Sequence, residues 1–401
     1  MTRPASRLFL ICLLGALNVI SPFSIDMYLP GFPQLAEQFH VSNTTIALTI
    51  SSYFVGMAFG QIFYGPLLDR YGRKKPLYVG MSVFIIASLG CAMSGQIHAL
   101  ILLRFVQAFG GCVSGVAALA MIRDFFPVEE GAKILSRMFL FIAVSPLLAP
   151  TIGGELILLA GWRFIFILLA IIAAAILTLM ALRLPESHQP DRSISLKPGP
   201  ILREYIAILR HPKFATYAFA GAFSFAGLFT YVAGSPIIFM EDFHLSPRAY
   251  SATFALLAAG FIGGSQFNVR LLKHFTSETL FLRTLSLQAV IGWAFVAVSA
   301  LGLLSFVTTL AFFFVFLACA GITYPNAAAI ALSPFAKNAG SAAALLGFLQ
   351  LGCGAFISTF ISLAPPQSAF PIIAILGVTV TIAVSILALG YRRAHTCATT
   401  D

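Results

Sequence analysis

Two charged residues lie within stretches of the sequence that are otherwise almost entirely apolar. Asp26 follows an apolar run that begins near residue 8, and Arg104 lies in LLRFVQAFGG (102–111). A charge in hydrocarbon is costly unless it is paired or hydrated. Burial raises the pKa of an acid, whereas a nearby arginine lowers it. A conformational change that alters either effect can therefore load or release a proton. We interpret Asp26 and Arg104 as a candidate proton-coupling pair at similar depth in the membrane.

Each of these charges also has a second interpretation. The first helix can end near Asp26, because Pro30 and Pro33 follow closely, and the carboxylate would then lie among lipid headgroups. Arg104 can instead be a hub of structural hydrogen bonds. The sequence leaves both alternatives open.

A second group of charges lies in GPLLDRYGRKKP (65–76). Two glycines permit a tight backbone turn, and basic residues hold a loop on the cytoplasmic side. Neither the turn nor the basic residues account for the acid, Asp69. Its carboxylate can interact with the positive N-terminal end of a neighbouring helix, which stabilises by about 0.3–2 kcal/mol. We predict that this loop is a gate or latch, and that its functional residues are Gly65, Asp69, Arg70, Gly72 and Arg73.

The segment SPLLAPTIGG (145–154) places prolines and glycines on one helical face. Pro146, Pro150 and Gly154 recur at intervals of four residues, and Gly153 precedes the last of them. Such a stripe bends a helix and lets a second helix approach closely. The alternative is the ordinary use of glycine and proline in membrane helices.

Polar and aromatic side chains inside apolar segments form a wider set of candidate ligand contacts. A mostly apolar cavity with a few polar groups suits amphipathic ligands, and the chain contains 39 Phe. Single amides in membrane helices more often bond another helix than a ligand. The candidate substrate contacts are Asn18, Gln107, Phe225, Phe229, Tyr231, Ser235, Tyr324, Asn326 and Gln350.

The elements that position these residues are predicted to be membrane-spanning helices. The 401 residues are 59% hydrophobic and 9% charged, whereas a soluble domain carries about 25% charged residues. Unbroken apolar segments of the length that crosses a bilayer recur along the chain, and they lack the alternation of β-barrel strands. We expect twelve helices, near residues 8–36, 44–66, 76–95, 98–122, 133–157, 162–184, 212–238, 248–272, 279–302, 305–332, 338–363 and 368–391.

A polar stretch near residues 184–205 divides these helices into two sets of six. The predicted domains are an N-terminal bundle (1–184), a cytoplasmic linker (185–211) and a C-terminal bundle (212–401). The fold class is therefore an all-α integral membrane protein, with two pseudo-symmetric six-helix bundles around a central cavity. The counterpart of the 65–76 loop, GGSQFNVRLLKHF (263–275), keeps glycine and basic residues but lacks the acid.

The net charge of +10 indicates membrane topology and not a nucleic-acid partner. With both termini in the cytoplasm, Arg163 and Arg248 fall outside, Arg104 falls within a helix, and the other basic residues fall inside. The six cysteines show no metal-type spacing, so we expect no metal. An integral-membrane enzyme would need a clustered nucleophile, base or metal, which the scattered histidines do not provide.

Several motifs resemble those of a known family. GPLLDRYGRKKP is similar to the signature loop of the major facilitator superfamily, LLRFVQAFGG to its helix 4 arginine motif, and SPLLAPTIGG to the helix 5 motif of its antiporter branch. Further segments resemble the twelve-helix drug and proton antiporters of the bicyclomycin and chloramphenicol resistance (Bcr/CflA) type. They are SPFSIDMYLPGFPQLA (21–36), MIRDFFP (121–127), GWRFIF (161–166), YVAGSPIIF (231–239), YPNAAAIAL (324–332) and GSAAALLGFLQLG (340–352).

The resemblance implies two bundles that rock around a central cavity and multidrug efflux across the bacterial inner membrane. Asp26 matches the family's helix 1 acid, and Arg104 matches its helix 4 arginine. The 65–76 loop matches the loop that clasps the cytoplasmic ends of the two halves. The expected partners are an amphipathic small molecule, protons and the bilayer; the proton gradient takes the place of a cofactor, and the protein acts as a monomer. Asn18 stands where some relatives carry a second acid, so the proton stoichiometry does not carry over.

Two alternatives keep this fold and change the cargo. One is export of an endogenous metabolite or siderophore, and the other is import of a nutrient. Only substrate-dependent transport in vesicles separates them.

Overall fold

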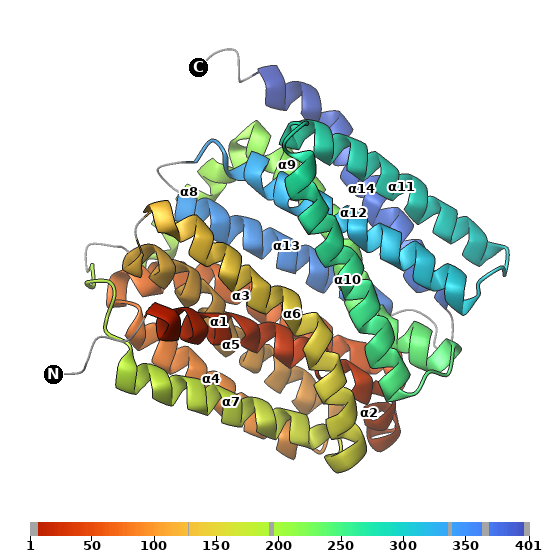
Figure 1. The fold of residues 1–401 in the computed structure, drawn as a ribbon, viewed down its shortest axis with the longest axis horizontal. Helices are drawn as coiled ribbons and strands as arrows, with labels where there is room; N and C mark the ends of the chain where they lie inside the picture. The colour runs from red at the N-terminus through yellow and green to blue at the C-terminus, as the bar shows by residue number, and fades with distance from the viewer. Residues whose placement is uncertain (1–6, 127, 192–195, 336–338, 363–368, 397–401) are drawn as a thin grey trace. The chain divides into compact units, whose positions relative to one another are not determined.

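The computed structural model describes residues 7–126, 128–191, 196–335, 339–362 and 369–396, and every regular element in these ranges is helical (Figure 1). The first half contains α1 (Arg7–Asp26), η1 (Leu29–Gly31), α2 (Phe32–Phe39), α3 (Asn43–Tyr71), α4 (Lys74–Met93), α5 (Ile97–Phe125), α6 (Val128–Ala160) and α7 (Trp162–Arg183). After α8 (Pro198–Arg210), the second half contains α9 (Pro212–Pro236), the π-helical turn η2 (Ile237–Asp242), α10 (Pro247–Leu271), α11 (Ser277–Ala300), α12 (Phe306–Leu332), α13 (Ala339–Ser362) and α14 (Ala369–Thr396).

The helices have the length and composition of membrane spans. Eleven segments among the described residues are long and apolar enough to cross a bilayer. A further apolar stretch, Val144–Ala160, belongs to α6, a helix of 33 residues. Each of the twelve segments predicted from the sequence therefore falls on helical structure, the first of them on an interrupted span, which confirms the all-α membrane fold.

The first span is interrupted near its middle. α1 ends at Asp26, and a short 3-10 turn separates it from α2. The prediction of one continuous helix over 8–36 is therefore wrong. Pro30 and Pro33 lack the N–H groups that would continue the helical hydrogen bonds. The residues from Met27 to Gly31 are buried, as irregular backbone at membrane depth must be.

The expected linker contains a helix that the sequence did not predict. α8 buries Tyr205 and Ile208 and exposes Leu202 and Ile206. The buried positions are three residues apart, which is a helical spacing. Pro198 suggests an irregular linker, but it stands at the start of α8, where a helix tolerates proline. At 13 residues, α8 is too short to cross a bilayer.

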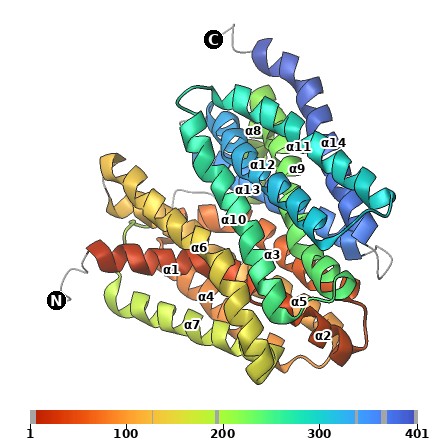
Figure 2. The ribbon, with the colours of Figure 1, turned by 45° about the vertical axis from the view of Figure 1, so that its right-hand side comes forward.

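The chain divides by packing into two compact units. Unit 1 contains residues 1–41 and 52–198, and unit 2 contains residues 42–51 and 199–401. Within unit 1, α1 packs against α5, α6 and α7, and α4 packs against α5 and α7 (Figures 1 and 2). Within unit 2, α9 packs against α12, α13 and α14.

Glycines spaced four residues apart allow one close helix pair in each unit. In unit 1, Gly56 and Gly60 of α3 lie directly against α5, where a Cβ at Gly56 would overlap the Phe105 carbonyl oxygen. In unit 2, Gly260 and Gly264 of α10 lie against α12 in the same way. Small residues at this spacing let membrane helices approach closely.

Candidate functional site

Arg104 lies in the core of unit 1 and is fully buried. Its Nη1 donates to the Ser24 backbone oxygen at 3.1 Å, to the Ser24 Oγ at 2.9 Å and to the Gln107 Oε1 at 2.7 Å. Gln107 Nε2 then donates to Ser88 Oγ at 2.7 Å. One guanidinium group thus connects α1 and α5, and Gln107 extends the network to α4. This geometry is that of a hydrogen-bond hub.

Aromatic rings surround the guanidinium of Arg104 where an acid would otherwise be expected. Its Cζ lies 4.2 Å from the ring centroid of Tyr53, 4.9 Å from that of Tyr28 and 5.6 Å from that of Phe166. Each such contact stabilises a cation by about 0.5–2 kcal/mol. Its Nε and Nη2 have no hydrogen-bond partner among the described groups.

Asp26 is the last residue of α1 and is only 7% exposed. Among the described residues, no hydrogen bond or ion pair joins it to Arg104. The geometry of the helix accounts for this, because two residues of a regular helix that are two positions apart point in nearly opposite directions, and Ser24 already faces Arg104. The two predicted coupling residues, Asp26 on α1 and Arg104 on α5, therefore lie near the same turn of α1 without a direct contact.

The proline and glycine motif of α6 packs against the interruption in the first span. A Cβ at Gly153 would overlap the Met27 carbonyl oxygen, and Met27 Cα would lie only 2.8 Å from it. On the other side of the interruption, a Cβ at Gly31 would lie 3.3 Å from Ile157 Cδ1. A close approach is thus present, and it is made by Gly153, which lies next to the predicted stripe of Pro146, Pro150 and Gly154. α6 continues through Pro146 and Pro150 as one helix.

The other polar candidates of unit 1 lie beside this network. Gln107 uses both ends of its amide, for Arg104 and for Ser88. Asn18 is half-buried on α1, and its Oδ1 faces Gly115 of α5. Both remain candidates for substrate contact, and Gln107 also ties α5 to α4.

The 65–76 loop is shorter than predicted, because α3 continues to Tyr71. Gly72 has φ +82°, a left-handed conformation that favours glycine, so the predicted turn is present there. The prediction of a turn at Gly65 is wrong, because this residue lies inside α3. A single proline at position 66 does not end the helix. Arg70 lies in the last turn of α3, and its guanidinium is 5.8 Å from the Tyr71 ring centroid.

Arg73 is the centre of a charged cluster at this turn. Its Nη1 donates to Asp69 Oδ1 at 2.6 Å and its Nε donates to Asp124 Oδ2 at 2.9 Å. Burial lowers the pKa of Arg73, but the hydrogen bonds and charges of Asp124 and Asp69 outweigh this and hold it above its ordinary value. Ser187 Oγ also donates to Asp124 Oδ2, at 2.8 Å. Sequence reasoning missed the role of Asp124, although this acid lies in the MIRDFFP segment.

A carboxylate does lie at a helix N-terminus here, but it belongs to Glu186. Glu186 accepts hydrogen bonds from the backbone N–H groups of Arg73 at 2.8 Å and Lys74 at 3.2 Å. These are unsatisfied donors at the start of α4, where a negative charge is favourable. Asp69 instead pairs with Arg73 within unit 1. The signal for Glu186 was an acid directly after a predicted span, in LPES (184–187).

The aromatic candidates of unit 2 form one cluster. The ring centroids of Phe225 and Tyr324 are 4.3 Å apart, and Phe225 also lies 5.2 Å from Phe229 and 6.1 Å from Phe261. These residues come from α9, α12 and α10. Phe225 and Tyr324 are half-buried, whereas Phe229 is 7% exposed and faces Gly354 of α13.

Three of the remaining unit 2 candidates, Ser235, Tyr231 and Asn326, bond neighbouring helices. Ser235 Oγ and the Tyr250 hydroxyl are 2.9 Å apart, and the Tyr231 hydroxyl donates to the Phe254 carbonyl at 3.4 Å. Asn326 Nδ2 donates to Asn268 Oδ1 at 2.7 Å and so joins α12 to α10. Gln350 is 7% exposed on α13.

Unit 2 also contains a hydrogen-bond network that sequence reasoning missed. Ser224 Oγ donates to Gln288 Oε1 at 2.7 Å and lies 2.8 Å from Thr323 Oγ1. This network joins α9, α11 and α12, the first, third and fourth spans of the second half. Its counterparts in unit 1 are Ser24, Ser88 and Gln107. Hydroxyls and single amides are too common in membrane helices to have indicated it.

The fold is that of a multi-pass helical membrane protein. The model of the Major Facilitator Superfamily matches residues 14–359, and the chain belongs to this superfamily.

The chain is similar to named bacterial proteins over most of its length. It is 32% identical over 378 residues to the uncharacterized MFS-type transporter YdgK of Bacillus subtilis, covering 94% of each chain. It is 30% identical over 386 residues to the bicyclomycin resistance protein homolog of Haemophilus influenzae, covering 96% of each. It is 31% identical over 348 residues to the multidrug resistance protein MdtL of Escherichia coli O81, covering 86% of each.

Solved structures share the fold at low sequence identity. The D-xylose-proton symporter superposes with a TM-score of 0.74 at 17% identity, covering 95% of this chain and 97% of the other. The peptide transporter POT in complex with sulfate superposes with a TM-score of 0.77 at 14% identity, covering 98% and 97%. These likenesses support the fold.

Proposed function

We propose that the protein is a proton-coupled antiporter that exports small amphipathic molecules by alternating access. The observation that carries the proposal is Asp26, a buried acid at the point where the first span loses its helical structure. Interrupted helices form the ion and substrate sites of many transporters. The relatives named for bicyclomycin and multidrug resistance support drugs as the cargo.

In this proposal Asp26 exchanges the coupling proton. Ser24 holds the same turn of α1 to Arg104, so a movement of α1 changes the surroundings of Asp26 while Arg104 stays fixed to Gln107. Burial and access to water weight the charged and neutral forms of an acid differently. Each pKa unit between two access states corresponds to about 1.36 kcal/mol of coupling.

The proposal includes a location, a topology and partners. The protein lies in the bacterial inner membrane with both termini and the 185–211 segment in the cytoplasm, because the basic residues concentrate on that side. Its partners are protons, an amphipathic molecule and lipid. It acts as a monomer driven by the proton gradient, with no cofactor and no catalytic step.

The charged cluster around Arg73 is proposed to act as a latch. Asp69 is 48% exposed at its side chain, so its carboxylate is accessible for a second contact during the transport cycle. Asp69→Asn is expected to slow transport and to leave ligand binding intact, measured as initial transport rate and equilibrium binding of the same compound. Wild-type transport rates in this variant would remove the latch role.

The decisive experiment measures protons released when a ligand is added. A growth-inhibition panel in an efflux-deficient host selects the compound, and transport direction in vesicles separates export from nutrient import. Purified protein in weak buffer is then titrated with that compound. We expect wild type and Glu37→Gln, an exposed acid on the same span, to release protons and Asp26→Asn to release none. Equal release by Asp26→Asn would place the coupling site elsewhere.

A further inference from the structure

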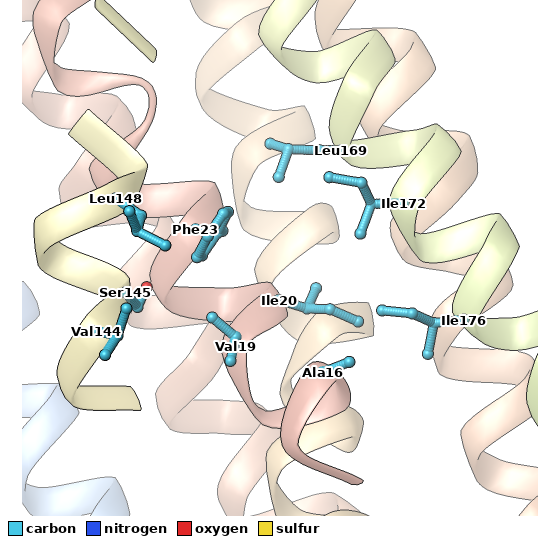
Figure 3. Close-up of a pocket in the computed structure, with 10 residues that line it drawn as sticks. All are labelled: Ala16, Val19, Ile20, Phe23, Val144, Ser145, Leu148, Leu169, Ile172 and Ile176. Atoms are coloured by element: carbon cyan, nitrogen blue, oxygen red, sulfur yellow. The ribbon is translucent and has the colours of Figure 1, made fainter. Parts of the chain in front are cut away.

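An apolar slot opens between α1, α6 and α7 in unit 1 (Figure 3). Its volume is about 450 Å³, within the range of about 300–1,000 Å³ that is typical of small-molecule sites. Phe23 of α1, Leu148 of α6 and Ile172 of α7 contribute to its walls. The residues that line it are apolar, with one exception, Ser145 of α6.

Ser145 brings a buried hydroxyl to the wall of the slot. It is 1% exposed, and its Oγ has no hydrogen-bond partner among the described groups. Two other buried serines of unit 1 bond the backbone of their own helix: Ser88 of α4 donates to the Phe84 carbonyl and Ser114 of α5 to the Gly111 carbonyl, both at 2.7 Å. Buried polar groups without a partner are rare and costly. A ligand with a hydrogen-bond acceptor would satisfy Ser145.

The surroundings of the slot restrict what can enter it. Leu148 at its edge is 48% exposed, and Ile171 and Leu179 on α7 are 56% and 44% exposed. α7 has the length and composition of a membrane span, so we expect its exposed apolar side chains to face lipid. The lining offers no charged side chain, and an unpaired charge in such a site is very unfavourable. A ligand must therefore be neutral and soluble in the bilayer.

We propose that this slot binds neutral amphipathic molecules that enter from the bilayer and accept a hydrogen bond from Ser145. This inference rests on the proposed export function, because it names the class of substrate that would be exported. A lipid acyl chain would fit the apolar walls but would leave Ser145 without a partner. Phe23 directly precedes Ser24, so an occupant would contact the turn of α1 that holds Arg104.

Benzophenone is a suitable probe, because it is neutral, apolar and carries one ketone acceptor, and light attaches it covalently to nearby C–H groups. The purified full chain in lipid nanodiscs is illuminated with increasing benzophenone, and labelled peptides are mapped by mass spectrometry. We expect saturable labelling of residues 144–148 and 169–176. Labelling of the exposed residues Leu287 and Val290 on α11, which serve as lipid-facing controls, should increase linearly with concentration.

Two kinds of variant distinguish the contribution of the Ser145 hydroxyl to ligand binding from that of the volume of the slot. Ser145→Ala keeps the slot and should raise the half-saturating concentration by about 2- to 12-fold, which corresponds to a hydrogen bond of about 0.5–1.5 kcal/mol. Ala16→Phe fills the slot and should abolish saturable labelling there, whereas Leu287→Phe should change nothing in the slot. Val19→Phe replaces Ala16→Phe if that variant does not give a monodisperse protein.

Three results would overturn the proposal. The first is labelling of the slot that never saturates. The second is saturation unchanged by Ser145→Ala. The third is a phospholipid with a photoactivatable chain that labels the slot and is not displaced by benzophenone. The proposed function can fail independently of the slot. If the protein shows saturable labelling but no proton-driven transport, the slot proposal stands and the proposed function fails. If it shows proton-coupled transport but no saturable labelling, only the slot proposal fails.

Discussion

Gly153→Ala tests whether the contact between α6 and the interruption after Asp26 holds the first span in place. The added Cβ would overlap the Met27 carbonyl oxygen and would lie 2.8 Å from Met27 Cα, so backbone must move and no flexible side chain can yield. Overpacking of this kind costs about 1–3 kcal/mol. Replacing glycine by alanine within a helix itself stabilises the folded state by about 0.5–1 kcal/mol. The expected net loss is up to about 2.5 kcal/mol.

The matched control is Gly263→Ala. Gly263 lies within α10, and a Cβ there would meet nothing within 4 Å. This variant receives the gain in helix propensity without the overlap, so it should be as stable as wild type or slightly more stable. The adjacent Gly264→Ala should behave like Gly153→Ala, because its Cβ would overlap the Ala318 carbonyl oxygen.

Unfolding of the purified variants by a denaturing detergent, followed by tryptophan fluorescence, gives the comparison. Trp162 and Trp293 report on the two halves of the chain. Gly153→Ala should also reduce proton-coupled transport more than Gly263→Ala does, because it displaces the backbone next to Asp26. Equal stability of Gly153→Ala and Gly263→Ala would refute the packing argument. Transport by Gly153→Ala at the wild-type rate would show that this packing is not needed for transport.

The remaining predictions concern the charged groups of unit 1, and thermal unfolding of the purified protein measures each. Glu186→Gln should destabilise it by about 0.3–1 kcal/mol at low salt, because it removes a charge from the N-terminus of α4; a loss that high salt does not reduce would contradict this. Asp124→Asn should lower the stability by about 1.5–3 kcal/mol, since it weakens a charged hydrogen bond with the buried Arg73. Asp69→Asn should lower it by less than about 1 kcal/mol, because the side chain of Asp69 is exposed. A larger loss for Asp69→Asn than for Asp124→Asn would contradict the structure. Arg104→Lys should lower stability despite keeping the charge, because lysine lacks the planar group that contacts Ser24 and the aromatic rings; an unchanged melting temperature would argue against the hub.

The sequence predicted the spans well because their signal is strong and local. In a chain with 9% charged residues, apolar runs of bilayer length rarely form anything but membrane spans. The ends of the elements were harder, as α3 shows: Pro66 and Gly65 suggested a turn, but the helix continues to Tyr71. The interruption after Asp26 was suggested by Pro30 and Pro33, yet the hydropathy of the segment favoured a single helix.

The candidate site could be predicted only in part, because charge is visible in a sequence and its partners are not. Arg104 stood out as a cation in an apolar stretch. Ser24 and Tyr53, which contact Arg104, and Ser88, which binds Gln107, are ordinary residues from other helices. No local pattern distinguishes them from similar residues elsewhere. Glu186 was missed for the same reason: its position directly after a predicted span was visible, but the backbone N–H groups that it binds at the start of α4 were not.

The two units show the same scaffold with different chemistry. Each has a glycine pair spaced by four residues on one helix and a network of hydroxyl and amide groups that joins three others. Among the described residues, only unit 1 has a buried cation in such a network, Arg104, and a buried acid near it, Asp26. In unit 2 the corresponding network of Ser224, Gln288 and Thr323 is neutral.

A neutral network and a charged one respond differently to substitution. Gln288 has neutral partners, so its loss removes hydrogen bonds between helices and changes stability. Gln107 has the same kind of position but binds a cation through its Oε1, so its loss also changes the field around α1. If the proton is exchanged at Asp26, a substitution at Gln107 must therefore alter the pH dependence of transport, whereas one at Gln288 must not. Under the proposal that Asp26 exchanges the proton, this asymmetry of charge between two similar scaffolds assigns the coupling chemistry to unit 1.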